Sequence, residues 1–208
     1  MKDILTMILS QIFHSDLGKE IESAGYIKNF ATGSVLVDLH SYVKSIPVVI
    51  SGSLKVMRTD DDGHEILLYY ITPGESCIVS ILAGMNNESS KIKAIVESDA
   101  EIMMIPAEKA KDWVKRFPEW TDFIFTLYQK RFDELLEVVN AVAFQKIDAR
   151  LLHLLKQKSQ LYQNSEISVT HQQLADELGI TREATSRVLK QMENEGVLQL
   201  SRNKIQLL

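Results

Sequence analysis

One predicted helix near the C-terminus carries side chains that could read DNA bases. In the segment TREATSRVLK, Glu183, Ser186, Arg187 and Lys190 follow a spacing of i, i+3, i+4 and i+7, with Arg182 beside them. At about 100° per residue, this spacing places them on one helical face. Arginine can pair with guanine O6 and N7, a carboxylate can accept from cytosine N4, and a serine hydroxyl can bond a base edge or a phosphate. The residue types therefore fit base recognition, although any surface helix also has a polar face.

A helix-turn-helix would hold this face in position. Thr170 and Gln173 have the spacing of a capping box and begin a first helix, which Gly179 ends. Thr181 caps the second helix and Gly196 ends it, after which VLQL, SRNK and IQLL predict strand, turn and strand. The pattern predicts a winged helix-turn-helix. The apolar side of the second helix is formed by Ala184, Val188, Leu189 and Met192.

Further candidate DNA contacts surround the polar face. Lys190, Arg202 and Lys204 could meet phosphates from the helix end and the wing, and Thr170 and Thr181 lie at the two helix starts. Residues 167–208 contain five Lys+Arg and five Asp+Glu, and the whole chain has a formal net charge of −5. Binding to DNA must therefore depend on a local basic surface, because the overall charge gives no attraction.

A long helix is predicted for residues 118–144. Pro118 suits the first helical position, and no helix breaker follows it. A second apolar set, made of Phe123, Leu127 and Leu136, indicates burial on more than one side. We expect the helix to pack on the preceding domain and on its twin in a homodimer; a core helix is the alternative. The dimer seam would be formed by residues spaced 4, 3, 4 and 3 apart, as in a coiled coil: Tyr128, Phe132, Leu135, Val139 and Val142.

The region from Gly25 to Ile105 has the pattern of short strands and turns. The runs SVLVDL, PVVI, SLKVMR, EILLYYI, KIKAIV and EIMMI alternate with turn signals, and Asp62-Gly63 predicts a tight hairpin. Regularly spaced short strands favour a barrel, roll or sandwich over a parallel α/β sheet. The other turn signals are Thr32-Gly33, Ser51-Gly52 and Pro73-Gly74.

These motifs together resemble the Crp/Fnr family of bacterial transcription regulators. ITREATSRVLKQMENEGVL resembles the family's recognition helix and wing entry, and VTHQQLADELG resembles the helix before it. ISGSLKVMRTDDDGHEILLYYITPGE is similar to its β-roll, with Gly52 and Gly74 at turn positions. QKRFDELLEVVNAVAFQKIDARLLHLL is similar to its dimerisation helix and the segment that follows. The resemblance covers nearly the whole chain.

The resemblance implies an α+β fold with three parts. Residues 1–117 would form a cyclic-nucleotide-binding-like β-roll sensor domain with flanking helices. Residues 118–144 would form the long central dimerisation helix, and residues 145–208 the C-terminal winged helix-turn-helix DNA-binding domain.

The resemblance also implies a function. Glu183 and Arg187 match the family's base-reading Glu and Arg, and Ser186 completes the Glu-x-x-Ser-Arg pattern of its fumarate-nitrate-type branch. Arg182 matches an extra base-reading Arg of the cyclic-AMP-type branch. We therefore expect a homodimeric regulator on a palindromic site with TTGA- or TGTGA-like halves one turn apart. The expected partners are double-stranded DNA, a second copy of the chain and RNA polymerase.

The sensor region departs from the family's cyclic-nucleotide site. Cyclic-nucleotide-binding members of the family hold the ligand with a Gly-Glu pair and an Arg-Ser pair. When this sequence is aligned with theirs on Gly74 and Ala94, Ile78 and Val79 stand in place of Gly-Glu, and Ile92 and Lys93 in place of Arg-Ser. A buried phosphate without a guanidinium is poorly compensated, although Lys91 or Lys93 could act as point charges. The sequence therefore argues against a cyclic nucleotide and leaves the effector unknown. The candidate effector pocket comprises Glu75, Cys77, Val79, Ile92 and Lys93.

Cysteine usage bears on other cofactors. Cys77 is the only cysteine, so an intrachain disulfide or a four-cysteine cluster within one chain is excluded. The N-terminal cysteine cluster of the family's iron–sulfur branch is absent, so no such cluster is expected. Haem stays open, because several potential ligands share the sensor region; an inert cysteine with core methionines is the alternative. The residues concerned are Cys77, His40, His64, Met85, Met103 and Met104.

Other function classes find less support. A cupin-like metal enzyme needs about three histidines and a carboxylate at one mouth of the roll, but only His40 and His64 lie there. No Gly-x-Ser-x-Gly, P-loop or dinucleotide motif occurs, so we do not expect an enzyme. A sensor module whose C-terminal domain contacts protein instead of DNA is a further alternative. The N-terminal MKDILTMILSQIF fits a helical face rather than a signal peptide, and no run is long enough to span a membrane, so we expect a cytoplasmic protein without a membrane partner.

Overall fold

The computed structural model describes residues 16–208, so the helical face predicted within residues 4–13 lies outside the described residues. The chain divides into two compact units. The first comprises the residues up to Arg58 together with Leu68–Leu135, and the second comprises Thr59–Leu67 together with Leu136–Leu208.

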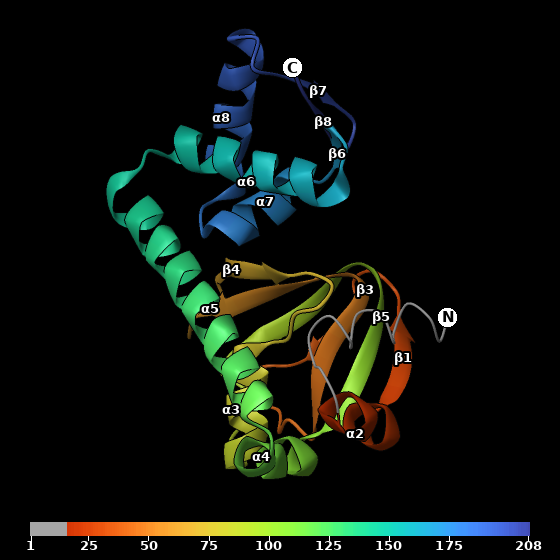
Figure 1. Ribbon diagram of the computed structural model, residues 1–208. Coiled ribbons are helices and arrows are strands. Elements are labelled where there is room, and N and C mark those ends of the chain that lie inside the picture. The colour runs from red at the N-terminus through yellow and green to blue at the C-terminus, as the bar shows by residue number, and fades with distance from the viewer. Residues whose placement is uncertain (1–15) are drawn as a thin grey trace. The chain divides into compact units, whose positions relative to one another are not determined.

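An antiparallel β-roll forms the centre of the first unit, as predicted (Figure 1). Its strands are hydrogen-bonded in the order β1-β5-β3-β4, and β2 also pairs with β5. The tight turn at Asp62-Gly63 connects β3 to β4, and Gly63 has a φ of 85°. The strands are β1 (Tyr26–Phe30), β2 (Val35–Val37), β3 (Ser45–Thr59), β4 (Glu65–Ile71) and β5 (Lys93–Pro106).

The prediction of a turn at Ser51-Gly52 is wrong, because β3 continues through these residues. The pairing of β3 with β5 shifts register on both sides of Ser51, so Gly52 sits in a β-bulge. Gly52 has a φ of 77°, and a Cβ there would lie 2.2 Å from the carbonyl oxygen of Asp99. Glycine is needed here for close approach of two strands rather than for a chain reversal.

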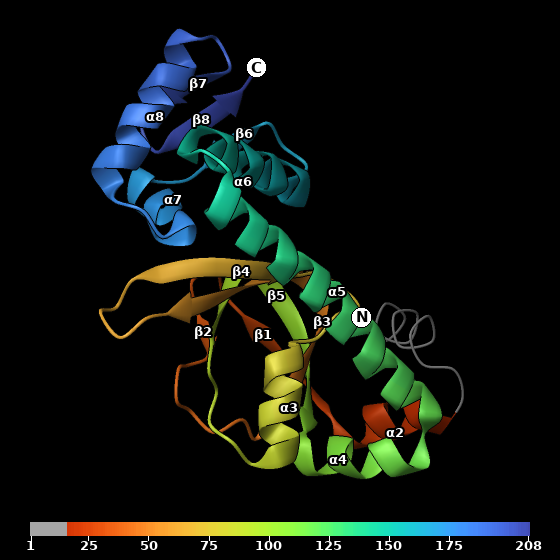
Figure 2. The same ribbon diagram turned by 90° about the vertical axis from the view of Figure 1, so that its left-hand side faces the viewer.

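Helices close one end of the roll. α2 and α4 lie at the same end of the sheet in both views (Figures 1 and 2). Trp113 of α4 and Trp120 of α5 are fully buried there, with ring centroids 5.6 Å apart in an edge-on arrangement. The sequence did not predict α3, whose buried residues leave little polar periodicity. The helices are α2 (Asp16–Ala24), α3 (Ile78–Asn86), α4 (Ala107–Arg116) and α5 (Pro118–Phe144).

Helix α5 has the predicted bounds. Leu127 is buried in the core of the first unit, and Phe123 packs against that core. Leu136, which was expected in the same buried set, is 52% exposed. The helix therefore buries its second apolar side only over its N-terminal half.

The second unit contains the predicted winged helix-turn-helix (Figure 2). Helices α7 and α8 pack on each other and on α6, and the strands form a sheet in the order β6-β8-β7. The short strand β6 was not predicted. Among residues 16–208, no helix combines the length and the apolar character needed to cross a lipid bilayer. The elements are α6 (Ile147–Tyr162), β6 (Glu166–Ser168), α7 (His171–Leu178), α8 (Arg182–Asn194), β7 (Leu198–Ser201) and β8 (Lys204–Leu207).

Candidate functional site

The start of α7 is fixed by a complete capping box. The Thr170 hydroxyl accepts a hydrogen bond from the Gln173 backbone N–H at 3.2 Å, and the Gln173 side chain accepts from the Thr170 N–H at 2.8 Å. Gly179 ends the helix in the left-handed region, with a φ of 63°. The turn that leads into α8 is therefore defined at both sides by local sequence.

The second helix begins as predicted at Thr181. Its hydroxyl accepts a hydrogen bond from the Ala184 N–H at 3.2 Å. Val188, Leu189 and Met192 of the predicted apolar side are buried, and Ala184 is half-buried. Thr185 is also fully buried and donates its hydroxyl hydrogen to the Thr181 carbonyl at 3.1 Å. That intrahelical bond lets a polar residue belong to the core face, which hydropathy spacing did not indicate.

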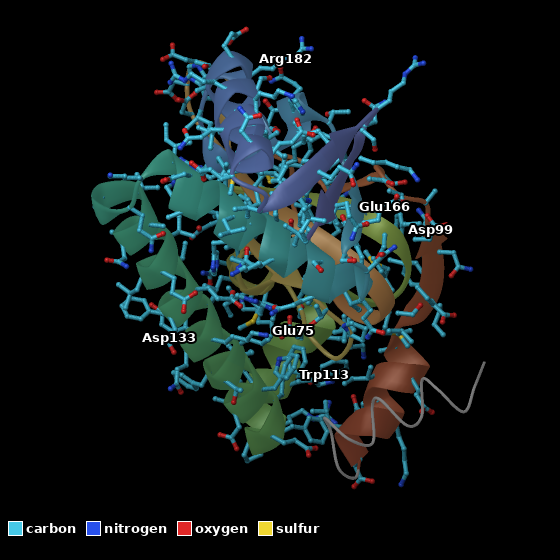
Figure 3. The ribbon with its side chains drawn as sticks, turned by 90° about the horizontal axis from the view of Figure 1, so that it is seen from above. Glu75, Asp99, Trp113, Asp133, Glu166 and Arg182 are labelled. Carbon is cyan, nitrogen blue, oxygen red and sulfur yellow. The ribbon has the colours of Figure 1, made fainter. Side chains whose placement is uncertain are left out.

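Three of the predicted base-reading residues have free side chains. Arg182, at the start of α8 (Figure 3), and Glu183 and Arg187 are exposed. Within residues 16–208, none of these three side chains has a hydrogen-bond or ion-pair partner. A guanidinium or carboxylate without an internal partner can bond an external group without first breaking a bond to the protein.

Ser186 differs from these three residues. It is half-buried, and its hydroxyl lies 2.8 Å from Nδ1 of His171, the first residue of α7. His171 could not be identified from the sequence, because no helical period links residue 171 to residue 186. Packing of α7 against α8 brings the two side chains together.

The predicted phosphate-binding cations lie on α8, on β8 and in the turn between β7 and β8. The Lys190 ammonium is 2.6 Å from the Glu193 carboxylate, and the Lys204 ammonium is 2.7 Å from Glu166. Exposed ion pairs of this kind contribute little to stability, so either lysine can exchange its partner for a phosphate. Arg202 is exposed in the β7–β8 turn, where Asn203 adopts a φ of 56°.

The predicted dimer seam on α5 is an exposed apolar stripe. The rings of Tyr128 and Phe132 stack with centroids 6.4 Å apart, so their surfaces form one continuous patch. Contiguous exposed apolar surface is typical of an interaction site. The exposed fractions are 53% for Tyr128, 50% for Phe132, 37% for Leu135, 61% for Val139 and 52% for Val142.

In the roll, Glu75, which is labelled in Figure 3, forms ion pairs with residues of α5. Arg131 is 2% exposed, and its guanidinium donates to Glu75 at 2.5 Å and to Glu134 at 2.6 Å. Lys130 also pairs with Glu75. Burial alone would raise the pKa of Glu75, but the Lys130 hydrogen bond and the Arg131 charge together lower it below its usual range.

Arg131 also joins this network to an aromatic residue. Its guanidinium lies 4.5 Å from the centroid of the Tyr69 ring, and it donates to the Tyr70 carbonyl at 3.1 Å. The Tyr69 hydroxyl is 3.9 Å from the Cys77 sulfur. Burial is the main cause that raises the pKa of Tyr69 well above its usual range, and the nearby Cys77 adds to this effect.

The remaining candidate pocket residues line or adjoin an apolar core. Cys77 and Ile92 are buried within it, Val79 packs against it, and Lys93 is half-buried on β5. Ile78, at the position expected for the phosphate-site glycine, is also buried. The buried guanidinium of Arg131 already forms ion pairs with two carboxylates, those of Glu75 and Glu134. These residues do not fit a cyclic phosphate, which needs a buried cation that is free to pair with it.

The candidate haem ligands differ in their surroundings. Cys77 is fully buried, whereas His40 and His64 are exposed. The Asp60 carboxylate accepts hydrogen bonds from the backbone N–H groups of Asp62 and His64, so this side chain closes the hairpin turn. Within residues 16–208, one group of three or more His, Cys, Asp or Glu side chains lies close enough together to hold a metal ion. It consists of Asp60, Asp62 and His64.

Family models match two segments of the chain. Residues 27–117 match the cyclic nucleotide-binding domain, and residues 145–208 match the Crp-like helix-turn-helix domain. The chain is 25% identical over 181 residues to the cAMP-activated global transcriptional regulator CRP of Haemophilus influenzae, covering 83% of this chain and 80% of that protein.

Solved structures share the fold over most of their length. A crp/fnr-family protein from Eubacterium rectale has a TM-score of 0.86 and 24% identity, covering 96% of this chain and 93% of that one. The c-di-GMP-responsive global regulator CLP of Xanthomonas campestris has a TM-score of 0.80 and 21% identity, covering 92% of this chain and 99% of that one. At these identities, the likeness establishes the fold.

Proposed function

The chain belongs to the Crp/Fnr family of transcription regulators, and on that premise we propose that it binds a palindromic DNA site as a homodimer. Each protomer would place α8 in the major groove and read bases with Arg182, Glu183, Ser186 and Arg187. Half-sites of the TTGA or TGTGA type, one helical turn apart, follow from the residues matched in the family.

The exposed side chains at the start of α8 carry this proposal. Arg182, Glu183 and Arg187 are unpaired and lie in the first two turns of a helix whose start is capped by Thr181. The N-terminal turns of a recognition helix are the part that contacts base edges. Lys190, Arg202, Lys204 and the hydroxyls of Thr170 and Thr181 would then contact phosphates on either side.

The apolar stripe of α5 supports the homodimer. Its residues follow coiled-coil spacing and are exposed in one copy of the chain. A second copy buries the same stripe on both helices through one two-fold axis, as a palindromic site requires. RNA polymerase is the protein partner that a DNA-bound regulator of this family is expected to meet.

The effector proposed for the roll is not a cyclic nucleotide. Glu75, Cys77, Val79, Ile92 and Lys93 remain the proposed pocket, but Arg131 already pairs with Glu75 and Glu134. An effector compatible with these surroundings would be small and largely apolar. Haem is a less favoured alternative, since Cys77 is buried while His40 is exposed.

Selection of DNA sites from a random pool with the purified protein tests the proposal. We expect a two-fold symmetric consensus, and a pool that shows no enrichment would contradict it. Arg187→Ala should then lose about 1–3 kcal/mol of binding and relax selectivity at one base pair. Arg187→Lys is the matched control, because it keeps the charge but loses the bidentate fork, so it should retain affinity better than selectivity.

A further inference from the structure

The contact between His171 and Ser186 crosses from α7 to α8. Nδ1 of His171 lies 2.8 Å from the Ser186 hydroxyl oxygen, and both side chains are half-buried. No other candidate base-reading residue is tied to a different element by a hydrogen bond among the described residues. Ser186 is thus the one predicted reader whose orientation depends on a second helix.

A serine hydroxyl has one hydrogen to donate and two lone pairs to accept, and it rotates to suit its surroundings. A hydroxyl that can rotate freely offers either role to a base, so it discriminates weakly. The bond to His171 uses either the hydrogen or one of the two lone pairs, and the remaining groups are left for an external partner. The imidazole therefore decides what Ser186 can offer.

The two neutral tautomers of His171 would leave different groups of Ser186 free. If Nδ1 carries the hydrogen, it donates to Ser186, and the serine hydrogen is left for an acceptor such as guanine O6 or thymine O4. If Nδ1 accepts from Ser186, the free lone pairs face a donor such as adenine N6 or cytosine N4. In the second case only the acceptor role is left for DNA, and in the first the hydroxyl hydrogen is directed away from the imidazole, so the contact restricts the hydroxyl before DNA binds.

We propose that His171 is a positioning residue that sets the donor or acceptor role of Ser186 and thereby the base preference at the position Ser186 reads. This inference rests on the proposed DNA-binding function. It assigns part of the sequence specificity to the first residue of α7, which need not contact that base itself.

The proposal is tested by measuring the base preferences of four protein variants. Each is titrated with the DNA consensus that the wild-type protein selects and with DNAs that differ from it at one base pair. His171→Ala and Ser186→Ala should each reduce discrimination at the same base pair by roughly 2- to 10-fold, the effect of one net hydrogen bond. The double variant should discriminate no worse than Ser186→Ala alone, because both substitutions remove the same interaction. His171→Asn should restore much of the preference, since asparagine carries a hydrogen-bonding atom at the δ position.

Gln172→Ala is the matched control, because Gln172 neighbours His171 on α7 but bonds to Asp176 on its own helix. It should leave the base preference unchanged. If His171→Ala weakened binding to all DNA sites equally, His171 would be a phosphate contact and the proposal would be overturned. Additive losses of discrimination in the double variant would also overturn it. If the wild-type protein selects no site, the proposed function fails; if it does and His171→Ala keeps the same preference, only the role of His171 fails.

Discussion

Arg131 is the most deeply buried charged side chain of the first unit's ion-pair network. Its charge is compensated by Glu75 and Glu134, and its planar face lies over Tyr69. Removing one member of a buried pair is costly, because the remaining charge stays in a poorly solvated place. The network therefore ties the loop before α3 to α5 through electrostatics rather than through apolar contact alone.

Glu75→Gln should destabilise the protein at neutral pH and much less at acidic pH. The pKa of Glu75 is lowered in the folded protein, so its ionised form contributes stability above the unfolded pKa, and this contribution is lost as the pH falls through the folded pKa. Urea unfolding should show a loss on the order of 3 kcal/mol at neutral pH. The difference from wild type should shrink toward pH 3, which lies below the usual glutamate range of about 4.3.

Glu88→Gln provides the control, because Glu88 is exposed and follows α3 without joining the network. It should leave the free energy of unfolding nearly unchanged at either pH. A loss for Glu75→Gln that is the same at neutral and acidic pH would show that the ion pair does not stabilise the fold.

At the scale of the elements, β3 depends on one backbone position, Gly52. Its bulge lets β3 and β5 pair along most of their length while the register shifts at Ser51. Gly52 combines a φ of 77° with a close approach to Asp99 and Ala100 of the facing strand. Two separate constraints, one conformational and one steric, therefore act on the same residue.

Gly52→Ala should lower the melting temperature far more than Gly63→Ala. Both glycines have a positive φ, but a Cβ at Gly52 would lie 2.2 Å from the Asp99 oxygen, whereas a Cβ at Gly63 meets nothing within 4 Å. The Gly63 variant measures the cost of backbone strain, about 1 kcal/mol, and the Gly52 variant adds the clash. Similar melting temperatures for the two variants would mean that β3 and β5 separate at the bulge without cost.

The sequence predicts the elements whose ends are set locally. Thr170 with Gln173, Gly179 and Thr181 define α7 and α8 because caps and left-handed glycines act within one turn of chain. The start of α5 was also set locally, because Pro118 suits the first helical position. Such signals need no knowledge of the tertiary contacts.

The features that the sequence missed depend on tertiary contacts. Helix α3 is apolar on most sides, so it shows no helical period. Strand β6 has three residues and is held by pairing with β8. Arg131 lies 56 residues from its partner Glu75 along the chain, and His171 lies 15 residues from its partner Ser186. Only folding brings each pair into contact.

At the scale of the whole molecule, the apolar stripe of α5 predicts self-association. Val139→Glu places a charge within that stripe, where burial against a second helix would be costly. Sedimentation velocity should show a dimer for the wild type and a monomer for the variant. Asn140→Glu adds the same charge at an exposed position on another side of α5 and should remain a dimer. A wild-type protein that sediments as a monomer at micromolar concentration would contradict this prediction.

Salt dependence separates DNA binding from a C-terminal domain that contacts protein. Under the proposed function, Lys190, Arg202 and Lys204 neutralise phosphates, and each neutralised phosphate would release counterions. The affinity for the selected DNA should therefore fall steeply between about 50 and 200 mM salt. Lys204→Gln should reduce that salt slope by about 1 and weaken all sequences alike. An affinity that does not change with salt would contradict phosphate contact at this surface.

The central claim is that two copies of α8 read two half-sites related by a two-fold axis. Its most direct test is a fluorescence-anisotropy titration of the selected palindrome and of the same DNA with about 5 bp, half a helical turn, inserted between the half-sites. The account predicts that the insertion reduces affinity to the level of a single half-site, because the second α8 then faces the opposite side of the duplex. Equal affinity for the two DNAs would contradict binding as a two-fold dimer.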